Sequence, residues 1–111
     1  MSNILDKRRA KRSIIRIKVF DANTGQLLGN TIDLNSTGML LVGTGEIPMG
    51  EDMSVRLEHT FHAEKHIILP AKVVWHMASV KPGMYNTGFY FIGATTEQTR
   101  FINNLIEELA M

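Results

Sequence analysis

Apolar and polar side chains alternate through residues 14–20, where the folded part of the chain begins. Every second position in this stretch is a β-branched apolar residue, namely Ile15, Ile17 and Val19. A period of two is typical of a β-strand with one buried face. Turn residues follow at Asn23-Thr24-Gly25, and residues 26–33 return along the first strand. The pattern therefore predicts a hairpin.

Four further strands are predicted downstream. They cover Met39–Val42 after Gly38, the strictly alternating segment 53–60, the long segment 66–77, and Gly88–Ile92. Glycine and proline clusters separate several of them, as expected for turns. Pro70 lies inside the longest segment, and because proline cannot donate a ladder hydrogen bond, it predicts a bulge or a sheet edge there.

A helix is predicted at the end of the chain, over about residues 96–110. Thr95 and Gln98 have the spacing of a capping box, in which each side chain bonds the other's backbone amide. An apolar stripe follows, made of Phe101, Ile102, Leu105, Ile106 and Leu109. We expect this stripe to pack mainly within the molecule. Six strands without intervening helices predict a mainly β fold, an antiparallel barrel or sandwich, with one terminal helix.

Composition limits the chain to one compact domain. It has 111 residues, of which 44% are hydrophobic, and no cysteine, which excludes disulfides, thiolate zinc sites and thiol redox chemistry. No apolar run approaches the roughly 18 residues of a membrane span, and the amino-terminal basic stretch lacks the apolar segment of a signal peptide. We expect a cytoplasmic protein.

Charge is strongly polarised along the sequence. Residues 1–18 contain seven cations and one anion, a net charge of +6, while residues 19–111 contain five cations and ten anions, a net charge of −5. Residues 1–13 are polar without periodicity. They are predicted to be a flexible basic arm, followed by the folded domain over residues 14–111.

Two short motifs stand out against this background. Arg8 and Arg12 have RxxxR spacing just before the first strand, and Asp33-Leu34-Asn35-Ser36-Thr37-Gly38 follows the pattern (D/N)xSxxG, with Asn35 at the Ser position. A weaker pair is Val73-Val74-Trp75 and Gly88-Phe89-Tyr90-Phe91. Together these motifs resemble the PilZ domain family over most of the chain. The resemblance implies a six-stranded antiparallel β-barrel with a C-terminal helix and binding of the bacterial second messenger cyclic di-GMP.

The resemblance also implies a set of ligand-binding residues. These are Arg8, Arg9, Arg12, Asp33, Asn35, Ser36, Gly38 and, less strongly, Trp75, with Lys7 at the position that influences how many ligands bind. Arginine suits such a ligand, since its planar fork binds phosphate or the guanine O6/N7 edge and also stacks on a base. A carboxylate at Asp33 accepts hydrogen bonds from the guanine N1 and N2 donors.

The expected function is that of a non-catalytic receptor. Ligand binding would order the arm against the Asp33–Gly38 surface and signal to a protein partner in motility, adhesion or biofilm control. Asn35 at the usual Ser position motivates an alternative, a PilZ-like adaptor that binds no nucleotide. The +6 segment motivates another, a barrel that binds nucleic acid electrostatically. The residues do not decide the number of ligands, the partner, or whether the protein is a monomer or dimer.

Catalysis and metal binding are not expected. The sequence has no nucleophile elbow, no phosphate-binding P-loop and no pair of carboxylates spaced for acid–base work. His59, His62 and His66 lie near two glutamates, yet their spacing matches no closed zinc pattern. No metal or other cofactor is therefore predicted beside the nucleotide ligand.

Overall fold

The computed structural model describes residues 15–45, 47 and 49–109. Its elements are β1 (Lys18–Asp21), β2 (Leu27–Asn35), β3 (Gly38–Gly43), β4 (Asp52–Glu58), β5 (His66–Ala78), β6 (Tyr85–Phe91) and α2 (Thr96–Leu109). The mainly β prediction of six strands and a terminal helix is confirmed. No helix in the described part of the chain is long and apolar enough to span a membrane.

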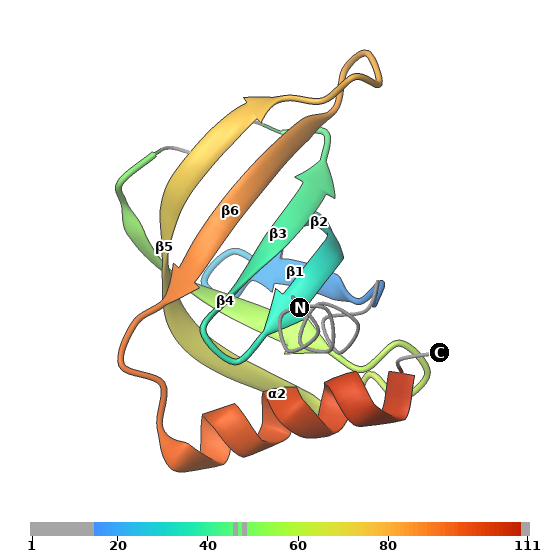
Figure 1. The fold of residues 1–111 in the computed structure, drawn as a ribbon, viewed down its shortest axis with the longest axis vertical. Coiled ribbons are helices and arrows are strands. Elements are labelled where there is room, and N and C mark those ends of the chain that lie inside the picture. The colour runs from blue at the N-terminus through green and yellow to red at the C-terminus, as the bar shows by residue number, and fades with distance from the viewer. Residues whose placement is uncertain (1–14, 46, 48, 110–111) are drawn as a thin grey trace, which may run out of the picture.

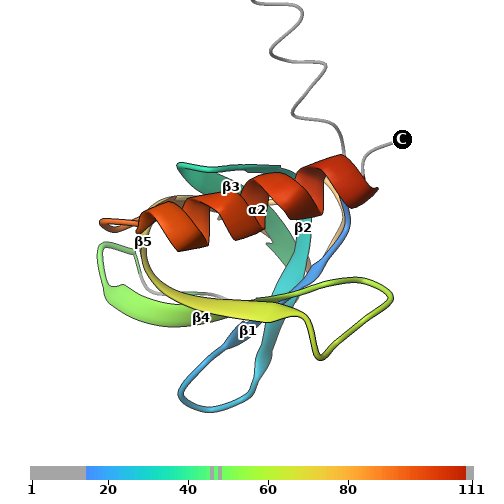
Figure 2. The same cartoon turned by 90° about the horizontal axis from the view of Figure 1, so that it is seen from below.

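The strands close into one antiparallel barrel in the order β1-β2-β3-β6-β5-β4. Helix α2 lies across one end of this barrel, as two perpendicular views show (Figures 1 and 2). The β5–β6 hairpin extends toward the opposite end (Figure 1). Closure pairs the long strands on both sides, which removes the exposed edges that an open sheet would present.

The barrel interior is filled by the alternating residues that the sequence marks out. Ile15, Ile17 and Val19 are all at most 1% exposed, and the residues between them face outward. The same alternation holds in β4, where Val55 and Leu57 are fully buried. Burial of each such side chain contributes about 1.5–3 kcal/mol, so this single core stabilises the fold.

Two β-bulges near the motif residues interrupt the alternation, and a further register shift leaves Leu28 of β2 as an extra residue opposite Val19 and Phe20 of β1. In β2 the register moves from Thr31 opposite Leu41 to Asp33 opposite Leu40, which leaves Ile32 as an extra residue. In β5 the register slips between Val73 and Trp75, which leaves Val74 as the extra residue. An inserted residue moves every later side chain to the other face of the strand.

The bulge in β5 lies four residues beyond the one suggested by Pro70. Pro70 pairs with Ser54 of β4 without a register shift. On its other side the β6 ladder ends at Phe91 opposite Ala71, and the Pro70 carbonyl accepts a bond from the Ile92 amide at 2.9 Å. The missing N–H of Pro70 therefore falls beyond the end of the β6 ladder, so no bulge is needed to accommodate it.

Helix α2 is fixed at its start by the predicted capping box. The Thr95 amide donates to Gln98 Oε1 at 2.9 Å, and the Gln98 amide donates to Thr95 Oγ1 at 3.1 Å. Gln98 Nε2 also donates to the carbonyl of Ile68 in β5 at 3.1 Å. Ile102 and Leu105 are buried against the barrel end. The apolar stripe is thus intramolecular core.

Thr31 anchors the beginning of the described chain. Its hydroxyl accepts a bond from the Ile17 amide at 3.1 Å and donates to the carbonyl of Ile15, while its own amide donates to the Ile17 carbonyl at 3.0 Å. Since Thr31 is 1% exposed, these bonds are shielded from water. Residues 15–17 are therefore held alongside β2. The predicted arm, residues 1–13, lies outside the described residues.

A candidate ligand-binding cavity on the outer face of the barrel

The two bulges decide which motif residues face outward. Thr31 and Leu34 of β2 both point into the core although they are three positions apart. Without the extra residue Ile32, the alternation from Thr31 would have turned Asp33 and Asn35 inward. The bulge instead places both of these polar side chains on the outer face.

The outward residues form two rows across β2, β3, β6 and β5. In the first row Asp33 lies opposite Leu40, Leu40 opposite Gly88, and Gly88 opposite Trp75. In the second row Asn35 lies opposite Gly38, Gly38 opposite Tyr90, and Tyr90 opposite Lys72, as the same pairings give. Residues that are distant in sequence are thereby brought onto one surface.

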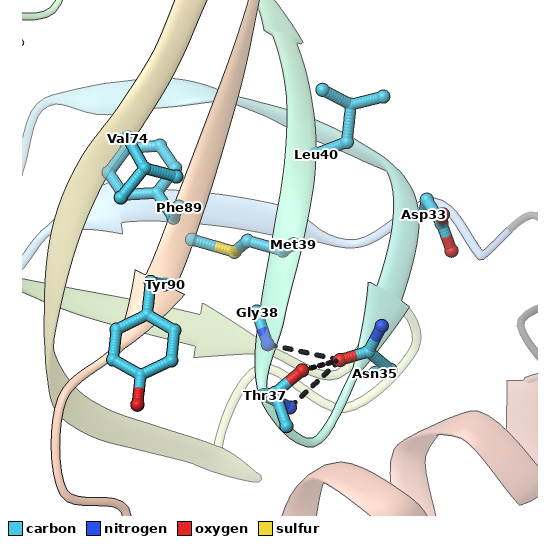
Figure 3. Close-up of a pocket in the computed structure, with 9 residues that line it drawn as sticks. All are labelled: Asp33, Asn35, Thr37, Gly38, Met39, Leu40, Val74, Phe89 and Tyr90. Carbon is cyan, nitrogen blue, oxygen red and sulfur yellow. Dashed lines mark hydrogen bonds between the residues drawn. The ribbon is translucent and has the colours of Figure 1, made fainter.

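Asn35 holds the turn between β2 and β3. Its Oδ1 atom accepts three hydrogen bonds: from the Thr37 amide at 2.8 Å, the Thr37 hydroxyl at 2.6 Å and the Gly38 amide at 3.1 Å. A serine oxygen at this position makes the same kind of turn, though more weakly. At the motif's Ser position, Asn35 therefore accepts the backbone hydrogen bonds of the turn. Its amide nitrogen points away from the turn, on the side of Asp33 (Figure 3).

A cavity of about 300 Å³ opens beside this turn. The predicted residues Asp33, Asn35 and Gly38 all line it, and Figure 3 shows the two polar side chains at one side of it. The remaining lining residues are Thr37, Met39, Leu40, Val74, Phe89 and Tyr90. A concave site with apolar walls and a few convergent polar groups is typical of small-molecule binding.

Several lining residues were missed by the motif reasoning. Leu40, Val74 and Tyr90 provide an apolar and aromatic wall, and Val74 and Tyr90 are each 53% exposed. The sequence contains their signal in Val73-Val74-Trp75 and Gly88-Phe89-Tyr90-Phe91. What the sequence could not supply was the cross-strand register that places both segments beside Gly38.

Ser36 and Trp75 do not line the cavity. Ser36 is a half-buried residue in the turn itself. Trp75 is 41% exposed and lies against Gly88, where an added Cβ would come within 3.3 Å of the Trp75 Cβ. Its indole is therefore at the end of the first row, beyond Leu40 and Gly88. A ligand larger than the cavity would be needed to reach it.

The predicted arginines Arg8, Arg9 and Arg12, together with Lys7, lie outside the described residues. The first described residue, Ile15, is bonded beside Thr31, two residues before Asp33 in β2.

His59 makes hydrogen bonds within the fold, and the ring of His62 lies beside it. His59 is 6% exposed, its Nδ1 accepts a bond from the Phe61 amide at 3.0 Å, and its Nε2 contacts Glu108 Oε1 of α2 at 3.1 Å. The His62 ring lies 4.9 Å from the His59 ring, centroid to centroid. Among the described residues no three His, Cys, Asp or Glu side chains are grouped to hold a metal.

The barrel, the helix across its end and the outer cavity define a small β-barrel domain with a candidate binding site. The PilZ domain family model matches residues 6–108, nearly the entire chain. The chain therefore belongs to the PilZ domain family. A search of curated proteins gave no match.

Solved structures share this fold at low sequence identity. They include the inhibitor of motility MotI/DgrA of Bacillus subtilis (TM-score 0.64, 11% identity, 87% of this chain and 47% of that chain covered). PlzA of Borreliella burgdorferi in complex with c-di-GMP gives a TM-score of 0.57 and 11% identity over 97% of this chain and 49% of that chain. The PilZ domain of CeSA from a cellulose-synthesizing bacterium gives a TM-score of 0.52 and 17% identity over 87% of this chain and 93% of that chain. This chain thus spans about half the length of the first two.

Proposed function

We propose that this protein is a non-catalytic receptor for cyclic di-GMP. The ligand would bind in the cavity beside the Asp33–Gly38 turn, with the arginines of the arm on its exposed side. Membership of the PilZ domain family supports this assignment, as does the shared fold with PlzA, a structure solved with that nucleotide. Binding would hold the arm against the barrel, and a protein partner would read the altered surface.

The observation that carries the proposal is the outward placement of Asp33 and Asn35 by the bulge at Ile32. This places one carboxylate and one amide at a cavity with an apolar wall. Guanine presents N1 and N2 donors on one edge, so the carboxylate of Asp33 matches that edge. Its O6 and N7 acceptors and the two phosphates require cations, which Arg8 and Arg12 would provide.

Isothermal titration of the full chain with cyclic di-GMP tests the proposal directly. We expect saturable binding at micromolar or tighter dissociation constants in moderate salt, with none for cyclic di-AMP or GTP. The stoichiometry of the titration also gives the number of bound ligands. Absence of heat, together with an unchanged melting temperature, would show that the protein is a PilZ adaptor without nucleotide binding.

Asp33→Ala is expected to weaken binding about tenfold to a hundredfold, because a guanine donor loses a charged acceptor worth about 1.5–3 kcal/mol. Glu107→Ala is the control, since it removes an exposed carboxylate from α2, outside the lining. The melting temperature of each variant, recorded beside its affinity, separates a loss of binding from a loss of folding. Equal affinity of the Asp33→Ala and native proteins would remove this carboxylate from the site.

A further inference from the structure

On the side of the cavity opposite Asp33 lies an aromatic residue, Tyr90. Tyr90 lines the cavity from β6 and is 53% exposed, whereas its neighbours Phe89 and Phe91 are each 3% exposed and belong to the core. In Figure 3 the Tyr90 ring stands out from the strand, on the same side of the sheet as the Asn35 turn. A half-exposed aromatic ring at a cavity offers a stacking surface for a planar ligand group.

Gly38 keeps the space beside this ring open. It lies directly opposite Tyr90 in the ladder and has no side chain to cover the ring. A Cβ atom built there would come within 2.3 Å of the Phe89 carbonyl oxygen, so no larger residue fits without backbone movement. The β3 position next to Tyr90 is therefore bare, and a planar ligand group has access to the ring from that side.

Lys72 lies on the other side of Tyr90. It is exposed and pairs with Tyr90 across the β5–β6 ladder. Among the residues of β2, β3, β5 and β6, Lys72 is the only lysine or arginine. The second row thus runs from the polar turn through the bare Gly38 and the aromatic ring to a positive charge, on strands rather than on a loop.

We propose that Tyr90 and Lys72 form a second half-site for the same nucleotide. This inference rests on the proposed function. Tyr90 stacks on one purine base, and Lys72 bonds the O6/N7 edge of that base. Base–aromatic stacking tolerates any base, so Tyr90 contributes affinity, while Lys72 and the Asp33 side distinguish guanine.

The dimensions of the row fit a ligand with two bases. Neighbouring strands are about 4.8 Å apart, so the three gaps from Asn35 to Lys72 span roughly 14 Å. A mononucleotide occupies only part of this distance. A cyclic dinucleotide extends a base toward each end and places its phosphates between them.

The alternative explanation gives Tyr90 and Lys72 only local structural roles. Tyr90 would merely cover the sheet surface, and Lys72 would merely offset Asp52, which lies opposite it in β4. Neither role requires a ligand, so the two explanations differ in what titration measures.

Titration of four variants with cyclic di-GMP distinguishes the half-site from these local roles. Tyr90→Leu keeps an apolar side chain but removes the aromatic face, and is expected to bind about tenfold more weakly, whereas Tyr90→Phe keeps the native affinity. Lys72→Met is expected to lose about fivefold to tenfold and to reduce the salt dependence of binding. Lys81→Met removes an exposed lysine of the β5–β6 connection and serves as the matched control, with native affinity expected.

Guanine absorbance gives an independent readout, because stacking on Tyr90 lowers it on binding. This decrease should be present with the Tyr90→Phe protein and reduced with Tyr90→Leu. If Tyr90→Leu and Lys72→Met bind cyclic di-GMP as tightly as the native protein does, the half-site is wrong while the receptor function stands. If the native protein binds no cyclic di-GMP, the proposed function fails, and the half-site fails with it.

Discussion

The Asn35 side chain holds the turn between β2 and β3 and also lines the cavity. One oxygen atom accepts three hydrogen bonds, two from Thr37 and one from the Gly38 amide. The Thr37 carbonyl in turn accepts a bond from the Phe91 amide at 2.9 Å, so the turn is fastened to the end of β6. A single side chain therefore fixes the loop that borders the candidate site.

Substitution of Asn35 tests this role. Asn35→Ala should lower the free energy of unfolding by about 1–2 kcal/mol, because two backbone amides and a hydroxyl lose their acceptor. Asn35→Ser should recover part of that loss, since a serine oxygen still accepts from the amide two residues on. Urea unfolding followed by the fluorescence of Trp75 measures both effects. The control is Asn104→Ala, which removes an exposed asparagine from α2. If Asn35→Ala unfolds at as high a urea concentration as this control, Asn35 does not stabilise the turn.

At the level of single residues, three members of the candidate site were predictable. Asp33, Asn35 and Gly38 follow a recognisable motif, and the structure brings all three to one cavity. Val74 and Tyr90 stand in the two weaker motifs, but a valine or aromatic residue in a strand is most often a core residue, so these motifs alone do not mark them as exposed. Their exposure follows from pairing with distant strands, which local sequence does not encode.

At the scale of elements, the two bulges explain what sequence patterns missed. Alternation predicted the existence of the strands and most of the core correctly. It failed at Ile32 and Val74, where one extra residue reverses the inward and outward faces. A bulge bends its strand and increases the local twist, and the curvature of a closed barrel depends on all six strands together. Pro70 gave a local signal for a bulge, yet the observed slip occurs four residues later.

Helix α2 is held to the barrel by a buried histidine as well as by its apolar face. Because His59 Nδ1 accepts the Phe61 amide, the neutral ring carries its proton on Nε2 and donates to Glu108. His59→Phe should lower the free energy of unfolding by about 1–2 kcal/mol, since the amide of Phe61 loses its acceptor and Glu108 loses its donor. Glu108→Gln should have little effect, because its amide oxygen still accepts from Nε2.

Circular dichroism at 222 nm and Trp75 fluorescence, recorded during urea unfolding, measure this helix attachment. The first signal follows α2 and the second follows the barrel. In the native protein the two transitions should coincide. Loss of the helix signal before the fluorescence change in His59→Phe would show that the histidine fastens the helix, whereas a native midpoint would contradict the role.

At the scale of the whole molecule, positive charge and binding surface come from different parts of the chain. The net charge of +6 belongs to residues 1–18, while the remaining 93 residues carry −5. Within the strands that form the cavity, Lys72 is the only lysine or arginine. A barrel that tracked a nucleic-acid backbone would instead need a continuous basic groove. The distribution favours a small anion held between an arm and a mostly uncharged surface.

Replacing Arg8 and Arg12 together by lysine distinguishes recognition by guanidinium groups from simple attraction. The double variant keeps the +6 charge but loses the planar forks that pair with phosphate or guanine and stack on bases. We therefore expect cyclic di-GMP affinity to fall at least about tenfold, with little change in its salt dependence, in titrations at two or more salt concentrations. Lys11→Gln removes a charge outside the RxxxR pair and should reduce affinity less. If the double variant binds normally and Lys11→Gln binds weakly, the arm acts through net charge, as in an electrostatic nucleic-acid-binding protein.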